Sequence, residues 1–204
     1  MIAKVALIRR MPKKISELDY LVPLQFKKEV TIGQLVNVPF RNRLVYGLIT
    51  EFTENESEEA QGKLKLIENI VWENSALTLK QLSFAIEISE FYNTPLGFIL
   101  QTCLPPLKKT KIKKIKISNA DRLKPAFRKK PEIKLYHDQK ERQEIFKKLI
   151  SSTGQTLILV PEVNATTDLN LLAEFQPTII SAELSEKEIF DLWFKIRTEE
   201  IKVV

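Results

Sequence analysis

The sequence contains very little cysteine, histidine or glycine, with one Cys, one His and five Gly among its 204 residues. The single cysteine, Cys103, excludes an internal disulfide and a zinc site made of several cysteines. No apolar run approaches the ~18 residues that a membrane-spanning helix needs. Residues 1–14 also lack the apolar core of a secretion signal. We therefore expect a cytoplasmic protein that does not contact a membrane.

Acidic residues are almost absent from one stretch of the chain, which is instead strongly basic. Eleven Lys or Arg residues lie between Lys108 and Lys130 against a single acid, Asp121, so this stretch carries +10 while the whole chain carries +6. Like charges and the prolines within and before the stretch oppose compact packing. We predict that residues 107–131, called the basic segment below, form a linker between two domains.

The basic segment has two interpretations. It is either a solvated linker kept soluble by its charge, or a strip that contacts the phosphate backbone of a nucleic acid. A basic run does not distinguish DNA from RNA as the ligand. Nine of its cations are candidate DNA contacts: Lys108, Lys109, Lys111, Lys113, Lys114, Lys116, Arg128, Lys129 and Lys130.

Residues 1–106 contain several short strand-like runs followed by one helix-like run. The spacing of Thr78 and Gln81 is that of a capping box, which predicts a helix over residues 79–92. Short strands followed by one helix are typical of a small β-barrel closed by a helix, and we predict this fold for residues 1–106. The predicted strands are 2–10, 18–23, 34–40, 44–53 and 63–72. The predicted apolar face of the helix is Leu79, Leu82, Ala85, Ile86 and Ser89.

Residues 132–204 alternate between strand-like and helix-like runs. Sustained β-α alternation predicts a doubly wound parallel sheet in this second domain. The whole chain is therefore expected to combine an α+β domain with an α/β domain. The predicted strands are 132–137, 155–160, 177–181 and 200–204, and the predicted helices are 139–151, 166–174 and 185–197.

A set of motifs resembles the primosomal protein N′ (PriA) family of replication-restart helicases. The motifs are LDYLVP (18–23), G-x-x-V-x-VPF-R (33–41), YGLI (46–49), LKLIENIV (64–71) and ISEFYNTPLGFILQTCLPP (88–106). They resemble that family's 3′-DNA-binding domain, and residues 154–169 and 192–204 resemble part of the first lobe of its helicase motor. The resemblance implies a barrel that holds the 3′ end of the nascent leading strand. It also implies forked or single-stranded DNA as partner, with other replication-restart proteins as further partners.

The family's 3′-end pocket falls on four positions of this sequence. Leu18 and Asp19 stand where the family has an aromatic or apolar residue followed by Asp, Lys65 stands at a family Lys, and Arg41 replaces a family Gly. An Asp can accept a hydrogen bond from a terminal 3′-hydroxyl, and a Lys can meet a phosphate. Leu18 cannot stack on a base as an aromatic residue does. Arg41 either adds a phosphate contact or blocks the pocket.

The nucleotide site of the family's motor is degenerate in this sequence. Aligned on the family's Gly-rich phosphate loop, His137 matches a His, Arg142 takes the lysine position and Gln143 takes the Mg²⁺-binding hydroxyl position, with no glycine between them. Without glycines the backbone N–H groups cannot wrap a phosphate. The metal motif and zinc-binding cysteines of the family are also absent. We therefore expect no ATPase activity, no cofactor and no bound metal in this chain.

Several isolated residues could be functional but have simpler explanations. We expect Cys103 to be a buried, inert thiol and His137 to be a structural or surface histidine. Trp72 and Trp193 are expected in the core rather than as stacking platforms. Glu162, which follows a predicted strand, is expected to be an ordinary loop carboxylate.

Two other interpretations stay open at this point. The abrupt end after the predicted strand 200–204 favours a piece of a longer ATP-dependent 3′–5′ DNA helicase, whereas the missing phosphate loop argues against it. Alternatively, the chain is a non-catalytic interaction scaffold whose second domain docks a partner from the replication machinery.

Overall fold

The computed structural model describes residues 1–12, 15–53, 64–107, 132–150, 154–159 and 175–204. The chain divides into two compact units, Met1–Arg122 and Leu123–Val204. Within the described ranges, no helix is long and apolar enough to cross a membrane.

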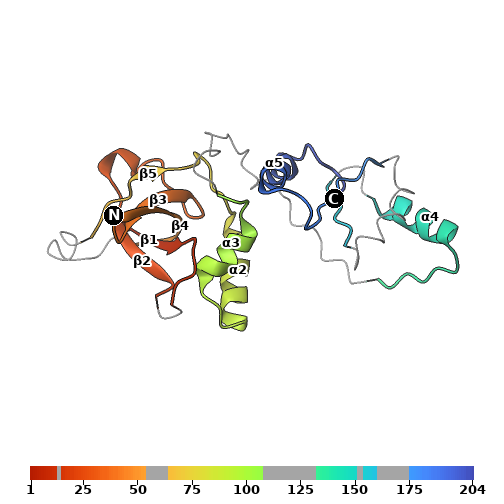
Figure 1. Ribbon diagram of the computed structural model, residues 1–204, viewed down its shortest axis with the longest axis horizontal. Helices are drawn as coiled ribbons and strands as arrows, with labels where there is room; N and C mark the ends of the chain where they lie inside the picture. The colour runs from red at the N-terminus through yellow and green to blue at the C-terminus, as the bar shows by residue number, and fades with distance from the viewer. Residues whose placement is uncertain (13–14, 54–63, 108–131, 151–153, 160–174) are drawn as a thin grey trace. The chain divides into compact units, whose positions relative to one another are not determined.

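An antiparallel five-stranded sheet forms the centre of the first unit (Figure 1). Its strands are β1 (Ile2–Leu7), β2 (Glu17–Leu21), β3 (Leu35–Phe40), β4 (Arg43–Thr53) and β5 (Asn69–Ile70). A short 3-10 turn, η1 (Leu24–Phe26), follows β2. The spatial order is β2-β1-β4-β3-β5. β1 is therefore an inner strand, and five of its six residues are buried.

The hydrophobic core lies on both faces of β1. Ala3, Val5 and Leu7 belong to one buried cluster, and Ile2 and Ala6, which face the other way, are equally buried. Successive side chains of a strand point to opposite faces. Because both the odd- and the even-numbered residues are buried, both sides of the sheet must be covered. The core cluster covers the side of Ala3, Val5 and Leu7. Helix α3 (Leu96–Cys103) also contacts β1.

The predicted closed barrel is not supported, because the five strands form an open order. The predicted strand 63–72 contributes only the two residues of β5 to the pairing with β3. Before β5 the chain meets β2 at one isolated parallel bridge, between Leu21 and Leu66. Leu21 N donates to Lys65 O at 2.9 Å, and Ile67 N donates to Leu21 O at 3.0 Å. A single bridge is not a continuous ladder, so β2 and β5 stay the two ends of an open sheet.

Two helices follow the sheet where one was predicted. Helix α2 (Leu79–Phe91) begins at Thr78 with the predicted capping box, which is confirmed: Gln81 N donates to Thr78 Oγ1, and Thr78 N donates to Gln81 Oε1. Leu82 and Ala85 are buried as expected, but Leu79 is 63% exposed, so its place on the apolar face was wrong. Pro95 ends the first helix pattern and starts α3, which packs beside α2 (Figure 1).

The second unit contains two of the three predicted helices, and no helicase-like lobe is present in its described residues. Helix α4 spans Gln139–Leu149 and helix α5 spans Glu186–Arg197. The predicted helix 166–174 lies outside the described residues.

The predicted doubly wound sheet is not found in the described part of the second unit. One parallel bridge joins Thr156 to Val203, within two of the predicted strands. Thr156 N donates to Lys202 O at 2.8 Å, and Val204 N donates to Thr156 O at 3.0 Å. Ile133, in the predicted strand 132–137, is 90% exposed. The alternating pattern of residues 132–137 is typical of a strand, but a strand needs a neighbour to bury its apolar side chains.

Candidate nucleic-acid interface

The predicted pair Leu18–Asp19 lies on β2, with its two side chains on opposite faces. Leu18 packs against the core cluster, whereas Asp19 is exposed. This follows from the alternation of side chains along a strand. Leu18 is therefore a partly buried core residue, and Asp19 is the member of the pair that a ligand can reach. Within the described residues, the Asp19 carboxylate accepts no hydrogen bond.

Asp19 belongs to a row of charged side chains that crosses three strands. It pairs across the sheet with Lys4 of β1, and Lys4 pairs on its other side with Glu51 of β4. Lys4 Nζ lies 2.7 Å from Glu51 Oε2. The hydrogen bond and charge of Glu51 raise the pKa of the Lys4 ammonium, and Glu17 and Asp19 add smaller contributions in the same direction. The Lys4 charge is thus already engaged with Glu51 rather than reserved for Asp19.

Lys65 lies beside the end of β2, two residues along that strand from Asp19. Its carbonyl oxygen accepts the hydrogen bond from Leu21 N, and its side chain is exposed. The structure therefore brings the backbone of Lys65 to the strand that carries Asp19. An exposed ammonium there is available to a phosphate.

Arg41 lies in a different neighbourhood, the turn between β3 and β4. Phe40 pairs with Arg43, so Arg41 and Asn42 form a two-residue hairpin turn. Arg41 has φ of 43°, in the left-handed region that glycine adopts without a steric cost. The backbone of this turn thus explains why a glycine suits the position, and Arg41 adopts the same conformation at some cost in strain.

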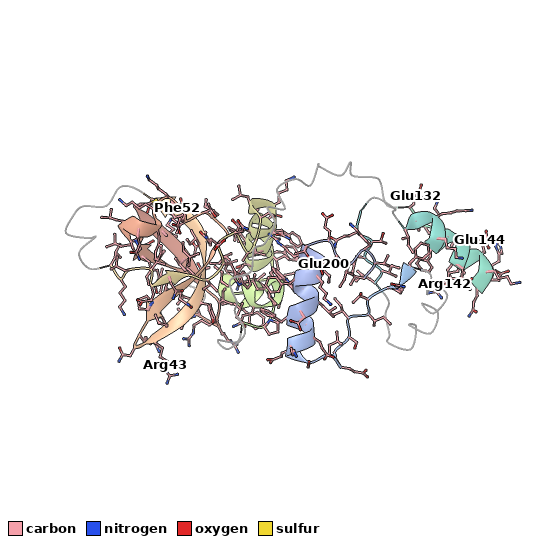
Figure 2. All side chains as sticks on the ribbon, turned by 90° about the horizontal axis from the view of Figure 1, so that it is seen from above. Arg43, Phe52, Glu132, Arg142, Glu144 and Glu200 are labelled. Atoms are coloured by element: carbon pink, nitrogen blue, oxygen red, sulfur yellow. The ribbon has the colours of Figure 1, made fainter. Side chains whose placement is uncertain are left out.

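A surface cavity of about 280 Å³ lies at this hairpin turn. It is lined by Arg9, Phe40, Arg41, Asn42 and Arg43. The guanidinium carbon of Arg9 lies 5.2 Å from the centroid of the Phe40 ring, and that of Arg41 lies 5.4 Å from it. Neither Asp19 nor Lys65 lines this cavity. Arg43 begins β4, and Figure 2 shows it at the opposite end of that strand from Phe52.

Sequence reasoning missed Arg9, Phe40 and Arg43 as candidate ligand-binding residues. The available signal was weak: two arginines end the first strand-like run, and Arg41 and Arg43 flank Asn42 in the turn. Only the strand pairing, in which Leu7 lies opposite Gly47 and Ile8 N donates to Tyr46 O, brings residue 9 to the hairpin.

The predicted contacts of the basic segment lie outside the described residues. This holds for all nine candidate cations between Lys108 and Lys130, and also for Glu162.

The degenerate nucleotide site lies at the N-terminus of α4, which is capped by the chain's own carboxylates. Glu141 N donates to Asp138 Oδ1 at 2.8 Å, and His137 N donates to Glu141 Oε2 at 2.8 Å. The guanidinium of Arg142 lies 5.5 Å from the rings of Tyr136 and of Phe146, while Gln143 is half-buried. The N–H groups of His137 and Glu141 thus have internal acceptors at the position where a phosphate loop would bind a phosphate.

The remaining candidates have structural surroundings. Trp72 is fully buried in the first unit, as expected, and Trp193 is half-buried beside Phe194. Cys103 is half-buried, and this burial raises the pKa of its thiol. The His137 side chain is 93% exposed. The described residues contain no group of three or more His, Cys, Asp or Glu that could hold a metal ion.

Comparisons with known proteins point to one family. Residues 7–105 match the family model of the PriA 3′ DNA-binding domain. Replication restart protein PriA of Rickettsia conorii is 28% identical over 224 aligned residues, which cover 98% of this chain and 34% of that protein. The Rickettsia felis protein of the same name is 26% identical with the same coverage, and that of Rickettsia prowazekii is 33% identical over 119 residues, 57% of this chain. The chain spans about a third of the length of the first two relatives.

Proposed function

This chain is a PriA-like protein, and from that premise we propose that it binds DNA at replication forks in replication restart, without an ATPase activity of its own. The observation that carries the proposal is the family match over residues 7–105, which runs from the end of β1 to the end of α3. In this proposal residues 1–106 are the DNA-binding domain, residues 107–131 link it to residues 132–204, and forked or single-stranded DNA is the ligand.

We assign the recognition of the 3′ end to the exposed face of β2. Asp19 accepts a hydrogen bond from the terminal 3′-hydroxyl of the strand, since its carboxylate is exposed and has free lone pairs. Lys65, beside the end of β2, meets a nearby phosphate as a point charge. Arg41 contributes a further phosphate contact from the hairpin turn.

Replacing the 3′-hydroxyl of a forked DNA by a dideoxy end is expected to weaken binding by about 10-fold. A hydrogen bond to a charged group contributes about 1.5 kcal/mol or more, and 1.4 kcal/mol is a tenfold change in affinity. Asp19→Ala, which removes the acceptor, is expected to bind both DNAs equally, at the level of the dideoxy fork. Fluorescence anisotropy with matched forks measures both effects.

Glu17→Ala is the matched control for this comparison. Glu17 lies two residues before Asp19 on the same strand and loses the same charge on substitution. It is expected to keep the preference for the 3′-hydroxyl. Equal affinity of the unmodified chain for the two forks would count against 3′-end recognition while leaving DNA binding itself intact.

We further propose that α4 does not bind a nucleotide. A phosphate approaching its N-terminus would meet the carboxylates of Asp138 and Glu141. These carboxylates already accept hydrogen bonds from Glu141 N and His137 N. Titration of the chain with ATP and Mg²⁺ in a calorimeter is expected to release no heat of binding. A measurable affinity would overturn this part of the proposal and favour the interpretation as part of an ATP-dependent helicase.

A further inference from the structure

We propose that Arg9, Arg41 and Arg43, grouped around Phe40, form a phosphate-binding site for the backbone of the bound DNA strand. This inference rests on the proposed DNA binding and adds to it a second contact, separate from the β2 face that carries Asp19. The ligand group is a phosphodiester, bound without regard to the base attached to it.

The three arginines line one cavity without a counter-charge. None of the three guanidinium groups forms a salt bridge with any residue in the described ranges, and no carboxylate lines the cavity. Lys4, by contrast, is neutralised by Glu51 at 2.7 Å. Like charges placed together repel one another, so this arrangement lacks the anion that would stabilise it. A phosphate supplies that charge.

Phe40 orients two of the arginines before any ligand arrives. The guanidinium groups of Arg9 and Arg41 both lie within the distance of a cation–π contact from its ring. A guanidinium packed on a ring loses less side-chain freedom when it binds, which favours affinity. Because the ring already contacts two guanidinium groups, we assign the site to a phosphate rather than to a stacked base. The fork of N–H donors on each arginine matches the oxygens of a phosphate.

The backbone of Ile8, directly before Arg9, is held from two sides. Ile8 N donates to Tyr46 O of β4 at 2.9 Å, and Gln101 Nε2 of α3 donates to Ile8 O at 3.3 Å. A side chain at Gly97 of α3 would overlap the carbonyl oxygens of Leu7 and Arg9, so the helix approaches this stretch as closely as a backbone can. The arginine that follows β1 is therefore fixed next to the hairpin by both the sheet and the helix.

The test is the salt dependence of binding to single-stranded oligothymidylate, measured for Arg9→Gln, Arg43→Gln and the double substitution. Removing one phosphate contact lowers the slope of log affinity against log salt by roughly 0.7 for single-stranded DNA. We expect a drop of about 0.7 for each single substitution and about 1.4 for the double substitution. The same drop is expected with oligodeoxyadenylate, because the site does not recognise the base.

Arg10→Gln is the matched control, since Arg10 is exposed, adjacent in sequence and absent from the cavity lining. It is expected to leave the slope unchanged. If the unmodified chain binds DNA but Arg9→Gln and Arg43→Gln change the slope no more than Arg10→Gln, this site is disproved and the proposed function stands. If the unmodified chain does not bind DNA at all, both fail. Thermal unfolding of each variant verifies that the fold is retained.

Discussion

Neutralising the basic segment is expected to remove most of the salt dependence of DNA binding. If about five of its cations meet phosphates, they contribute roughly −3.5 to −4.5 to the slope of log affinity against log salt. A rise from 50 to 200 mM salt would then weaken binding by roughly 100- to 500-fold through the basic segment alone. Substituting the nine candidate cations by Gln should remove that contribution and leave the smaller change from the first domain, roughly 50-fold if Lys65, Arg9, Arg41 and Arg43 each meet a phosphate. The measurement is a binding titration at several salt concentrations. The cations are Lys108, Lys109, Lys111, Lys113, Lys114, Lys116, Arg128, Lys129 and Lys130.

A comparison of equal charge changes separates local contact from general charge. The substitutions Lys108→Gln, Lys109→Gln and Lys111→Gln together remove three charges from the basic segment. Lys140→Gln, Lys147→Gln and Lys148→Gln remove three from the exposed surface of α4. We expect the first set to lower the slope by roughly 2 and the second to leave it nearly unchanged. Equal slopes for the two sets would mean that net charge alone governs binding and would refute the contact strip.

Local sequence signals predicted the elements whose stability is local. The capping box of Thr78 and Gln81 defined the start of α2, because its hydrogen bonds need only residues three apart. Alternation located the long strands of the first unit, where a covering core rewards the pattern. Ile133 and Leu135 have the same alternation but stay exposed, since no described strand pairs with them. An apolar pattern shows which face of a segment could be buried. It does not show which other part of the chain packs against that face.

The candidate site likewise has one part that local sequence predicted and one part that depends on residues distant in the chain. Asp19 could be found from a motif because the resemblance covers its immediate neighbours. The arginine site could not, because Arg9 and Arg43 are distant in sequence and meet only through the pairing of β1 with β4. The positive φ of Arg41 is also a property of the hairpin register. The sequence left open whether Arg41 adds a phosphate contact or blocks the pocket, and the hairpin register places it in the lining of a basic cavity.

The second prediction of large effect is that Gly33→Ala destabilises the first unit by on the order of 3 kcal/mol. Gly33 has φ of 81°, which an alanine adopts only with strain. An added Cβ would also overlap the backbone carbonyl of Leu77. That carbonyl cannot simply move away, because Gly33 O accepts hydrogen bonds from Ala76 N at 2.8 Å and Leu77 N at 3.2 Å.

Gly33→Ala would also affect residues outside the turn. Gln34 connects residues 33–34 to residues 72–77 a second time. Its fully buried side chain donates from Nε2 to Trp72 O at 3.0 Å and to Glu73 O at 2.8 Å. Displacing residues 76–77 would disturb these bonds and the start of α2. Urea unfolding followed by Trp72 fluorescence, in a Trp193→Phe background, measures the loss in the first unit alone.

Gly47→Ala provides the comparison that tests the cause. Gly47 has an ordinary backbone conformation, and an added Cβ there would press on a side-chain methyl of Val5 rather than on a carbonyl. Val5 is fully buried and β-branched, so it cannot move aside freely, and we expect an overpacking cost of about 2 kcal/mol. If Gly33→Ala costs no more than Gly47→Ala, the turn at Gly33 is not the rigid joint between the sheet and the helices. If it costs more, the positive φ and the clash with the Leu77 carbonyl at Gly33 account for the difference.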